Sequence, residues 1–236
     1  MARTVRVERV STSDGDLDAH VVLPEAGSGP GIVVLQEIFG VGGYIKEAAD
    51  RLAGLGYVAL APDLYWRIEP GIAVAHDEDG LRRAFGVAQQ LDHGLAVRDA
   101  IDSLHALREL PEVTDGKAGV LGFCLGGTLA FEVAIEDDPD LAVCYYGSGI
   151  AGMLDRADRI SCPVLLHFGG SDPYIPREQS DAVCAFAASR PDMECHIHED
   201  AGHAFDNHEA PMFHQPEPAA QAWAMTKDFL ARTLPV

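Results

Sequence analysis

Three residues that could perform acyl-transfer chemistry follow one another along the chain, and the first of them is a cysteine. Cys124 lies in Gly122-Phe-Cys-Leu-Gly126, which fits the pattern of a tight strand-to-helix turn that presents a nucleophile. A helix that begins after such a turn directs its N–H groups and positive dipole end at the nucleophile. That environment favours a thiolate and a developing oxyanion. For this motif alone, a glycine-rich turn with a buried structural cysteine is the alternative.

An aspartate and a histidine follow the cysteine, and each comes just after a short apolar run. Asp172 lies in Gly-Gly-Ser-Asp-Pro173, and His203 lies in Asp200-Ala-Gly-His-Ala-Phe205. An aspartate in a glycine-rich turn is commonly a turn-former, and an isolated histidine is commonly structural. The order nucleophile, acid, histidine, however, is that of hydrolases with a strand-to-helix nucleophile turn. We therefore expect His203 to activate Cys124 and Asp172 to orient the imidazole.

The elements that would position these residues alternate between short apolar strands and helices. We expect an antiparallel pair over 4–10 and 17–23, and a loop over 62–80. Further strands are expected over 31–35, 57–61, 117–121, 141–146, 163–168 and 194–198, and helices over 44–55, 81–90, 92–110, 125–135, 177–189 and 219–230. This alternation predicts an α/β fold, a mostly parallel twisted sheet with helices on both faces. No long linker divides the chain, which predicts a single domain over 1–236.

Charge and hydropathy exclude some classes of partner. Seventeen basic residues against 37 acidic ones give a net charge of −20, which repels nucleic acid and anionic membranes. No apolar stretch approaches the ~18 residues that span a bilayer, and the N-terminal residues lack the apolar core of a signal peptide. We expect no nucleic-acid partner, no membrane association and a monomeric chain.

The chain has five cysteines, an odd number, and no C-x-x-C pair. This argues against a disulfide framework and against a zinc site, and free thiols predict a reducing compartment, the cytoplasm. The four cysteines expected to be packed or unreactive thiols are Cys144, Cys162, Cys184 and Cys195. A histidine cluster that includes His196 and His198 is the alternative that would bind a metal, but no metal or organic cofactor is expected.

Several segments, distributed over nearly the whole chain, resemble the dienelactone hydrolase family. They are Val34-Leu-Gln-Glu-Ile-Phe-Gly40, Ala61-Pro-Asp-Leu-Tyr65, Gly122-Phe-Cys-Leu-Gly-Gly127, Tyr145-Tyr-Gly147 and Ala201-Gly-His-Ala-Phe205. The resemblance implies an α/β-hydrolase fold, a cysteine in place of the usual serine at the turn, and hydrolysis of a lactone or small carboxylic ester.

The resemblance also implies roles for Glu37, Ile38 and Leu125. In the family, a glutamate at the position of Glu37 keeps the resting thiol neutral, which like-charge repulsion and an S–H hydrogen bond explain. A solvated loop carboxylate is the alternative for this residue. The backbone N–H groups of Ile38 and Leu125 would form the oxyanion hole, in agreement with the general rule for this fold.

The match fails at one substrate contact. Family members that cleave dienelactone hold its carboxylate with two arginines, of which one matches Arg82 and the other falls on Asn207, beside Asp206. A neutral amide replaces a charge-assisted contact there, so we expect a less anionic ester or lactone. Tyr146 is expected to line the pocket, with core packing as its alternative, and Arg82 has the alternative of a surface arginine.

These observations predict a cysteine-dependent hydrolase that forms a thioester acyl-enzyme. Two alternatives remain open at this point. One is a general esterase or thioesterase with the same fold. The other is a non-catalytic member that binds a ligand or senses redox state.

Overall fold

The computed structural model of the protein describes residues 3–236. Its internal contacts define two compact units. The first runs up to Val120 and includes Val236, and the second comprises Leu121–Pro235. Strand β5 (Val113–Phe123) continues from one into the other. The prediction of a single domain over 1–236 stays a prediction.

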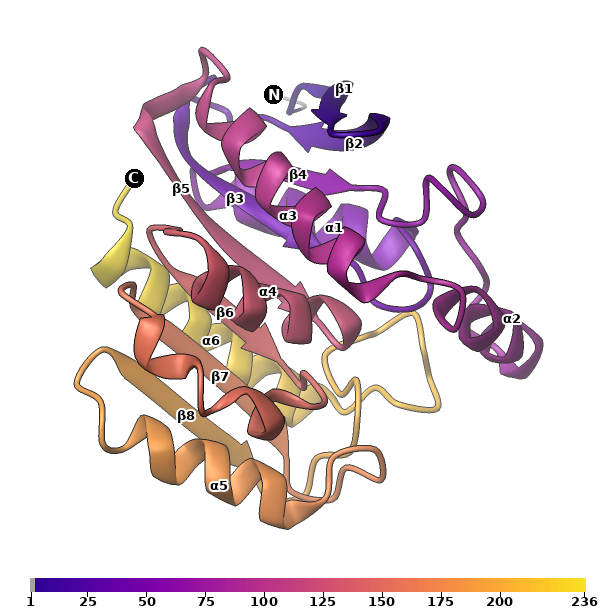
Figure 1. Cartoon of the computed structure of the whole chain (residues 1–236), viewed down its shortest axis with the longest axis vertical. Helices are drawn as coiled ribbons and strands as arrows, with labels where there is room; N and C mark the ends of the chain where they lie inside the picture. Colours follow the sequence, from indigo (N-terminus) through magenta and orange to yellow (C-terminus); the bar gives the residue numbers. More distant parts are fainter. Residues whose placement is uncertain (1–2) are drawn as a thin grey trace. The chain divides into compact units, whose positions relative to one another are not determined.

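The first unit contains a mixed sheet with the strand order β1-β2-β4-β3-β5 (Figure 1). Its first four strands are β1 (Val5–Thr12), β2 (Gly15–Val22), β3 (Gly29–Leu35) and β4 (Val58–Pro62). β1 and β2 pair antiparallel, which confirms the predicted pair, and β2 is also antiparallel to β4. β3 and β4 are parallel. Every residue of β3 is buried, as its continuous apolar run predicts.

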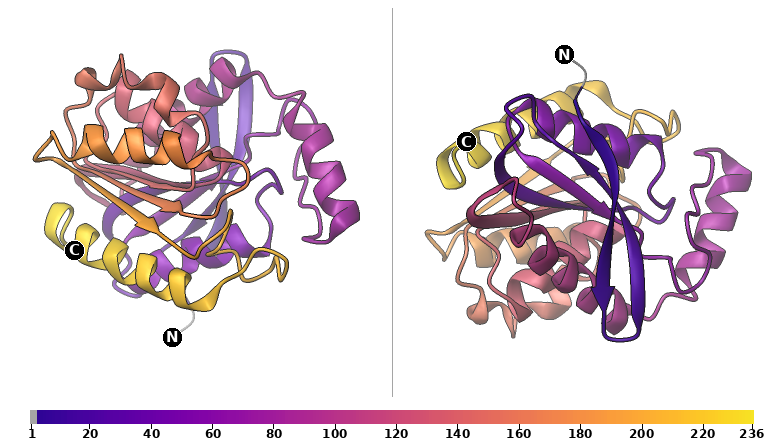
Figure 2. Two further views of the ribbon diagram at one scale, coloured as in Figure 1. Left: turned by 90° about the horizontal axis from the view of Figure 1, so that it is seen from below. Right: turned by 90° about the horizontal axis from the view of Figure 1, so that it is seen from above.

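Three helices belong to this unit: α1 (Gly43–Gly54), α2 (Glu78–Ala88) and α3 (His93–Arg108). α1 and α3 lie on opposite faces of its strands (Figure 2). The side chain of Asp77 caps α2 by accepting a hydrogen bond from the N–H of Gly80. Because this cap starts the helix at Glu78, the predicted loop over 62–80 ends too late and the predicted helix from residue 81 begins too late.

The second unit contains the parallel strands β6 (Ala142–Tyr145), β7 (Val164–Gly169) and β8 (Met193–His198). They follow β5 in that order, so β8 is an edge strand. Helices α4 (Leu125–Glu136) and α5 (Arg177–Ala187) cover one face of these strands, and α6 (Pro216–Thr233) covers the other (Figure 2). Two short 3-10 helices, η1 (Ile150–Met153) and η2 (Ala157–Arg159), were not predicted.

Each unit has an apolar core formed by its strands and the helices packed on them. The largest buried side chains of the first unit include Leu17, Ile32, Leu35, Tyr44 and Tyr65, and those of the second include Phe123, Phe131, Tyr145, Phe168, Phe205 and Phe229. Within residues 3–236, no helix combines the length and the apolar character that crossing a bilayer requires.

β5 is longer than the predicted strand over 117–121. It begins at Val113, and it contains two residues with left-handed backbone, Asp115 with φ 55° and Gly116 with φ 63°. An Asp-Gly pair usually marks a turn. Here the strand accommodates the pair without ending.

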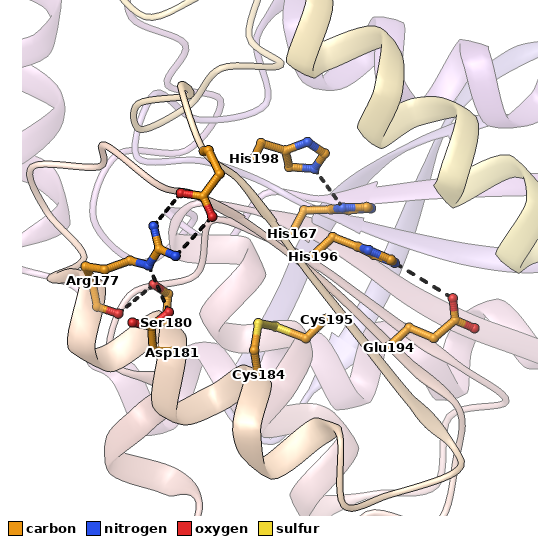
Figure 3. The surroundings of a disulfide bond; sticks show 10 residues. His167, Arg177, Ser180, Asp181, Cys184, Glu194, Cys195, His196 and His198 are labelled. Atoms are coloured by element: carbon orange, nitrogen blue, oxygen red, sulfur yellow. Dashed lines mark hydrogen bonds and ion pairs between the residues drawn. A yellow bond between two sulfur atoms is a disulfide. The ribbon is translucent and has the colours of Figure 1, made fainter.

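One prediction about the cysteines is wrong. Cys184 of α5 and Cys195 of β8 form a disulfide, with their Cα atoms 5.1 Å apart (Figure 3), whereas Cys144 and Cys162 are buried free thiols as expected. α5 packs against β8, and this tertiary contact brings together two cysteines that no local motif relates. Because two of the five cysteines are paired, free thiols no longer support the prediction of a reducing compartment.

Candidate active site

Cys124 occupies the single-residue junction between β5 and α4 in a strained backbone conformation. Its φ is 53° and its ψ is −114°, a combination that residues with a side chain rarely adopt. The N–H of Cys124 donates to the carbonyl oxygen of Tyr145 at 3.0 Å, and its own carbonyl accepts from the N–H of Thr128 at 3.1 Å. These bonds over-determine the backbone, as a stored strain at a functional site requires.

The glycines around Cys124 allow the backbone segments to approach closely. A Cβ added to Gly122 would lie 2.0 Å from the carbonyl oxygen of Gly126. A Cβ on Gly127 would lie 2.4 Å from the carbonyl oxygen of Tyr145, and one on Gly147 would lie 2.7 Å from the backbone nitrogen of Thr128. No larger residue fits at these distances, so the glycine pattern read in the sequence is a steric requirement of the turn.

His203 lies between the cysteine and the aspartate. Its Nε2 is 3.1 Å from the Sγ of Cys124, and its Nδ1 is 2.7 Å from the Oδ2 of Asp172. A carboxylate only accepts hydrogen bonds, so Nδ1 carries a proton and donates it to Asp172. Nε2 therefore faces the sulfur as the atom that can exchange a proton with it. The structure brings together the three residues that the sequence places far apart.

Asp172 is held firmly in the loop between β7 and α5. Its second oxygen, Oδ1, accepts the backbone N–H of Tyr174 at 2.8 Å and that of Ile175 at 3.2 Å. No part of its side chain is exposed. The turn-forming contacts and the contact with His203 are made by different oxygens of one carboxylate.

The pKa of His203 is shifted strongly. Burial of the imidazole opposes its charged form, but the charges of Cys124 and Asp172 and the hydrogen bonds to both outweigh burial and raise the pKa to about 10. Nearby anions stabilise an imidazolium in this way. The arrangement therefore stabilises a proton on His203 when negative charge lies beside the ring.

Two tyrosines pack against the imidazole. The ring of Tyr146 lies 5.3 Å from that of His203, and the ring of Tyr174 meets it edge-on at 5.0 Å. Tyr146 is fully buried, whereas Tyr174 is 47% exposed. Sequence reasoning missed Tyr174, although its position two residues after Asp172 in an Asp-Pro-Tyr turn was a usable signal.

A cavity of about 450 Å³ opens beside His203. Its lining is contributed by the acid loop, the histidine loop and the segment before α6, namely Ser171, Pro173, Asp200, Gly202, His203, Met212, Phe213, His214 and Gln215. Sequence reasoning missed the residues after Asn207, because an irregular segment carries no periodic pattern that would place them. The volume is within the range of small-molecule sites.

Glu37 and Ile38 belong to the first unit, in the loop after β3. Glu37 is only 1% exposed, which excludes its alternative as a solvated loop carboxylate. The carbonyl oxygen of Ile38 accepts a hydrogen bond from the hydroxyl of Tyr65 at 3.1 Å. Leu125 opens α4 in the second unit, where the first N–H groups of a helix have no intrahelical acceptor. The roles expected for Glu37, Ile38 and Leu125 stay predictions.

Two of the three expected substrate-binding side chains, Arg82 and Asn207, differ in their surroundings. Arg82 of α2 is 70% exposed and pairs with Asp79. Asn207 is completely buried, and its Oδ1 accepts the backbone N–H of Glu209 at 3.0 Å. Substrate binding by Arg82, Asn207 and the buried Tyr146 stays a prediction.

The histidines of β8 are engaged with a buried neighbour. The Nε2 of His198 lies 3.3 Å from the Nδ1 of His167, and the ring of His196 stacks on that of His167. His208 and His214 contact each other elsewhere. In the described part of the chain, no three or more His, Cys, Asp or Glu side chains form a group that could hold a metal ion.

Comparison with known proteins identifies relatives along most of the chain. The model of the dienelactone hydrolase family matches residues 17–234. A carboxymethylenebutenolidase from Pseudomonas sp. (strain P51) is 37% identical over 225 residues, which cover 94% of this chain and 92% of the relative. A carboxymethylenebutenolidase from Rhodococcus opacus is 34% identical over 226 residues, covering 90% and 84%.

A solved structure supports the same assignment. The crystal structure of a dienelactone hydrolase-like promiscuous phosphotriesterase from metagenomic libraries is 27% identical and has a TM-score of 0.83. The match covers 99% of this chain and 100% of that one. The predicted α/β-hydrolase fold is confirmed. The chain therefore belongs to the dienelactone hydrolase family, a family of carboxylic ester hydrolases.

Proposed function

We propose that the protein hydrolyses a lactone or small carboxylic ester with Cys124 as nucleophile, His203 as general acid and base, and Asp172 as the group that orients the imidazole. The observation that carries this proposal is the continuous chain of contacts from Cys124 Sγ through His203 to Asp172, at 3.1 Å and 2.7 Å. Both distances suit proton transfer and orientation.

The acylation step follows from this geometry. His203 Nε2 takes the thiol proton, and the sulfur forms a bond to the carbonyl carbon, whose oxygen becomes an oxyanion. We assign that oxyanion to the N–H of Leu125 at the start of α4 and, by family resemblance, to the N–H of Ile38. Loss of one such donor usually costs ~3–4 kcal/mol of transition-state stabilisation. When the oxyanion collapses, the C–O bond breaks and the alkoxide takes the proton from His203, which leaves a thioester.

Deacylation reverses these roles. His203 removes a proton from a water molecule, whose oxygen attacks the thioester carbon. The C–S bond then breaks, the sulfur recovers a proton from the imidazolium and the carboxylic acid is released. With a lactone substrate the leaving alcohol stays attached to the acyl group, so the product is a hydroxy acid. The contact between His203 and Asp172, at 2.7 Å, stabilises the imidazolium that forms in each step.

We further propose that Glu37 keeps the resting thiol neutral. A buried carboxylate disfavours a nearby thiolate by like-charge repulsion, and Glu37 has almost no exposed surface. A neutral resting thiol is also less susceptible to oxidation than a standing thiolate.

The substrate class is proposed from one departure from the family pattern. Asn207 stands where family members that cleave dienelactone have a second arginine. The buried carboxylate of Asp206 lies next to it in the chain. We therefore propose a substrate with less negative charge than a lactone that carries a carboxylate. The monomeric state and the cytoplasmic location stay predictions.

Pre-steady-state hydrolysis of a nitrophenyl ester tests the proposal. Wild type should release a burst of nitrophenol equal to its active-site concentration, and mass spectrometry of the quenched enzyme should find one acyl group on Cys124. Cys124→Ala should show neither, whereas Cys162→Ala, which removes a free thiol outside the site, should keep both. Turnover that survives in Cys124→Ala would refute the proposed nucleophile.

A further inference from the structure

The acid loop and the histidine loop of the second unit are packed backbone against backbone. A Cβ on Gly169 would lie 2.4 Å from the carbonyl oxygen of Gly202, and one on Gly170 would lie 2.5 Å from that of Glu199. The N–H of Gly170 donates to His198 at 2.8 Å, and the N–H of Ser171 donates to Ala201 at 2.9 Å. Any displacement of β8 is therefore transmitted directly to the pair formed by Asp172 and His203.

β8 has less support from the sheet than its neighbours. It pairs in parallel with β7 and is the last strand in the order, so its other edge has no strand partner among residues 3–236. His203 follows the end of this strand by five residues and depends on its position. Besides its pairing with β7, β8 is supported by α5, which packs against it.

Two cross-links join α5 to β8 and its following loop (Figure 3). The disulfide between Cys184 and Cys195 connects the middle of the helix with the middle of the strand. Arg177, the first residue of α5, forms a two-point ion pair with Glu199, the first residue after β8, at 2.5 Å and 3.0 Å. The helix that begins just after the acid loop is thus bound at two levels to the strand that leads to the histidine.

Both cross-links, the disulfide and the ion pair, are at least partly exposed to solvent. Cys184 and Cys195 are both half-buried rather than enclosed in the core, so part of each residue is open to solvent. The ion pair is exposed, with 42% and 65% of its two side chains accessible, and exposed pairs contribute little by themselves. The covalent bond is therefore the stronger constraint and also the one that a change of redox conditions can remove.

We propose that the Cys184–Cys195 disulfide is a redox-sensitive positioning element that keeps His203 in register with Asp172, and that its reduction slows hydrolysis. This inference rests on the proposed function, because it assumes that His203 and Asp172 act together on Cys124. The two cysteines do not touch the reacting atoms. They act by fixing β8 against α5.

A dithiol is one reductant that can open this disulfide. One of its thiolates attacks a sulfur of the disulfide, the S–S bond breaks, and a mixed disulfide forms while the departing sulfur takes a proton. The second thiol of the reductant then displaces the remaining cysteine. The protein gains two electrons and two protons, and the dithiol becomes a disulfide. Cys124 is a free thiol and is unchanged by this exchange.

The experiment compares oxidised wild type, wild type reduced with a phosphine, and Cys184→Ser/Cys195→Ser. The phosphine is chosen because an added thiol would itself attack a thioester acyl-enzyme. It cleaves the S–S bond with one water molecule, giving two thiols and the phosphine oxide. Steady-state hydrolysis of a nitrophenyl ester gives kcat and KM, an NMR titration of the His203 imidazole reports its contact with Asp172, and circular dichroism monitors folding.

We expect reduction to lower kcat about tenfold with less than a twofold change in KM, a smaller loss than the ~10²-fold that a 1 Å misplacement can cause. The titration midpoint of His203 should fall at the same time, because a weaker contact with Asp172 stabilises the imidazolium less. The double variant should behave like reduced wild type and should not respond to the phosphine. An unchanged kcat and midpoint, or reduction that unfolds the chain, would overturn the proposal.

Two exposed arginines, one on α5 and one on α6, provide a matched comparison, because each pairs with a glutamate in β8 or directly after it. Arg177→Gln removes the ion pair to Glu199, and Arg232→Gln removes the ion pair that α6 makes with Glu194 near the start of β8. After reduction, Arg177→Gln should lower kcat further and Arg232→Gln should not; equal effects would overturn the proposal. If oxidised wild type shows no turnover, the proposed function fails, and the His203 midpoint alone then decides whether the disulfide positions the pair.

Discussion

Asp172 holds His203 with one carboxylate oxygen while its other oxygen is held by the backbone that follows it. Oδ2 lies 2.7 Å from His203 Nδ1, and Oδ1 accepts the N–H groups of Tyr174 and Ile175. The carboxylate cannot rotate without losing one of these sets of bonds. Its orientation therefore fixes both the tautomer of the imidazole and the direction in which Nε2 points, which is toward Cys124.

Asp172→Asn should reduce kcat by about 10⁴-fold with a small effect on KM, as loss of the orienting carboxylate does in comparable triads. The amide can turn its NH₂ group toward Nδ1, which would favour the wrong imidazole tautomer. Steady-state hydrolysis of a nitrophenyl ester measures the loss. Asp158→Asn removes a carboxylate that is 88% exposed and lies away from the triad, and it should leave kcat unchanged. A decrease of less than tenfold in Asp172→Asn would contradict the role assigned to this residue.

The pKa of His203 should fall when Cys124 is replaced by alanine. Burial of the imidazole opposes its charge, and the charge of Cys124 is the largest influence that raises the pKa to about 10. In Cys124→Ala the hydrogen bond and charge of Asp172 remain, so the pKa should decrease without losing all of its elevation. An NMR titration of labelled histidine measures it in both proteins. In Cys124→Ala/Asp172→Asn the pKa should fall further, and an unchanged value in either protein would contradict the assigned causes.

Gly122→Ala should destabilise the nucleophile turn severely. Its new methyl group would lie 2.0 Å from the carbonyl oxygen of Gly126, so the start of α4 must shift away. We expect a loss of about 3 kcal/mol in the free energy of unfolding, the upper range for overpacking, together with loss of esterase activity. Urea denaturation measures the first quantity. Gly152→Ala is the matched control, because an added Cβ there meets no atom within 4 Å, and equal stabilities for the two variants would contradict the steric argument.

The meeting of Cys124, Asp172 and His203 was predictable because each residue follows an apolar strand at a turn with a local signature. The glycines around Cys124 are visible in the sequence for the same reason that the fold needs them, namely close backbone contact. Helix starts depend on a single capping side chain, and the Asp77 cap of α2 was overlooked for that reason.

Other features arise from contacts between segments that the sequence does not relate. The Cys184–Cys195 bond depends on the packing of α5 on β8, and an odd number of cysteines without a paired motif pointed away from it. The same limit applies to the cavity beside His203, whose irregular wall includes Met212 and Phe213. His167, buried and close to His198, is likewise apparent only once β7 and β8 are paired.

Asn207→Arg should shift substrate preference toward anionic lactones. A charge-assisted contact contributes about 1.5–3 kcal/mol, so kcat/KM for a lactone with a carboxylate should rise at least about tenfold relative to a neutral lactone. Because Asn207 is completely buried, its replacement also tests whether the site can admit a longer side chain, and Asn207→Gln provides the neutral control of intermediate length. If Arg and Gln change the ratio of the two kcat/KM values equally, the charge at this position does not determine the substrate.

Removal of the disulfide should lower the stability of the oxidised protein as well as its activity. The bond joins residues separated by 11 positions, and closure of a loop of this length is worth about 3 kcal/mol through restriction of the unfolded chain. Urea denaturation of wild type and of Cys184→Ser/Cys195→Ser should differ by about that amount, and the phosphine should bring wild type to the level of the variant. The two readouts separate two roles of one bond. A loss of stability with an unchanged kcat would place the bond in the scaffold alone, because the unfolded chain is constrained whether or not β8 holds His203 against Asp172.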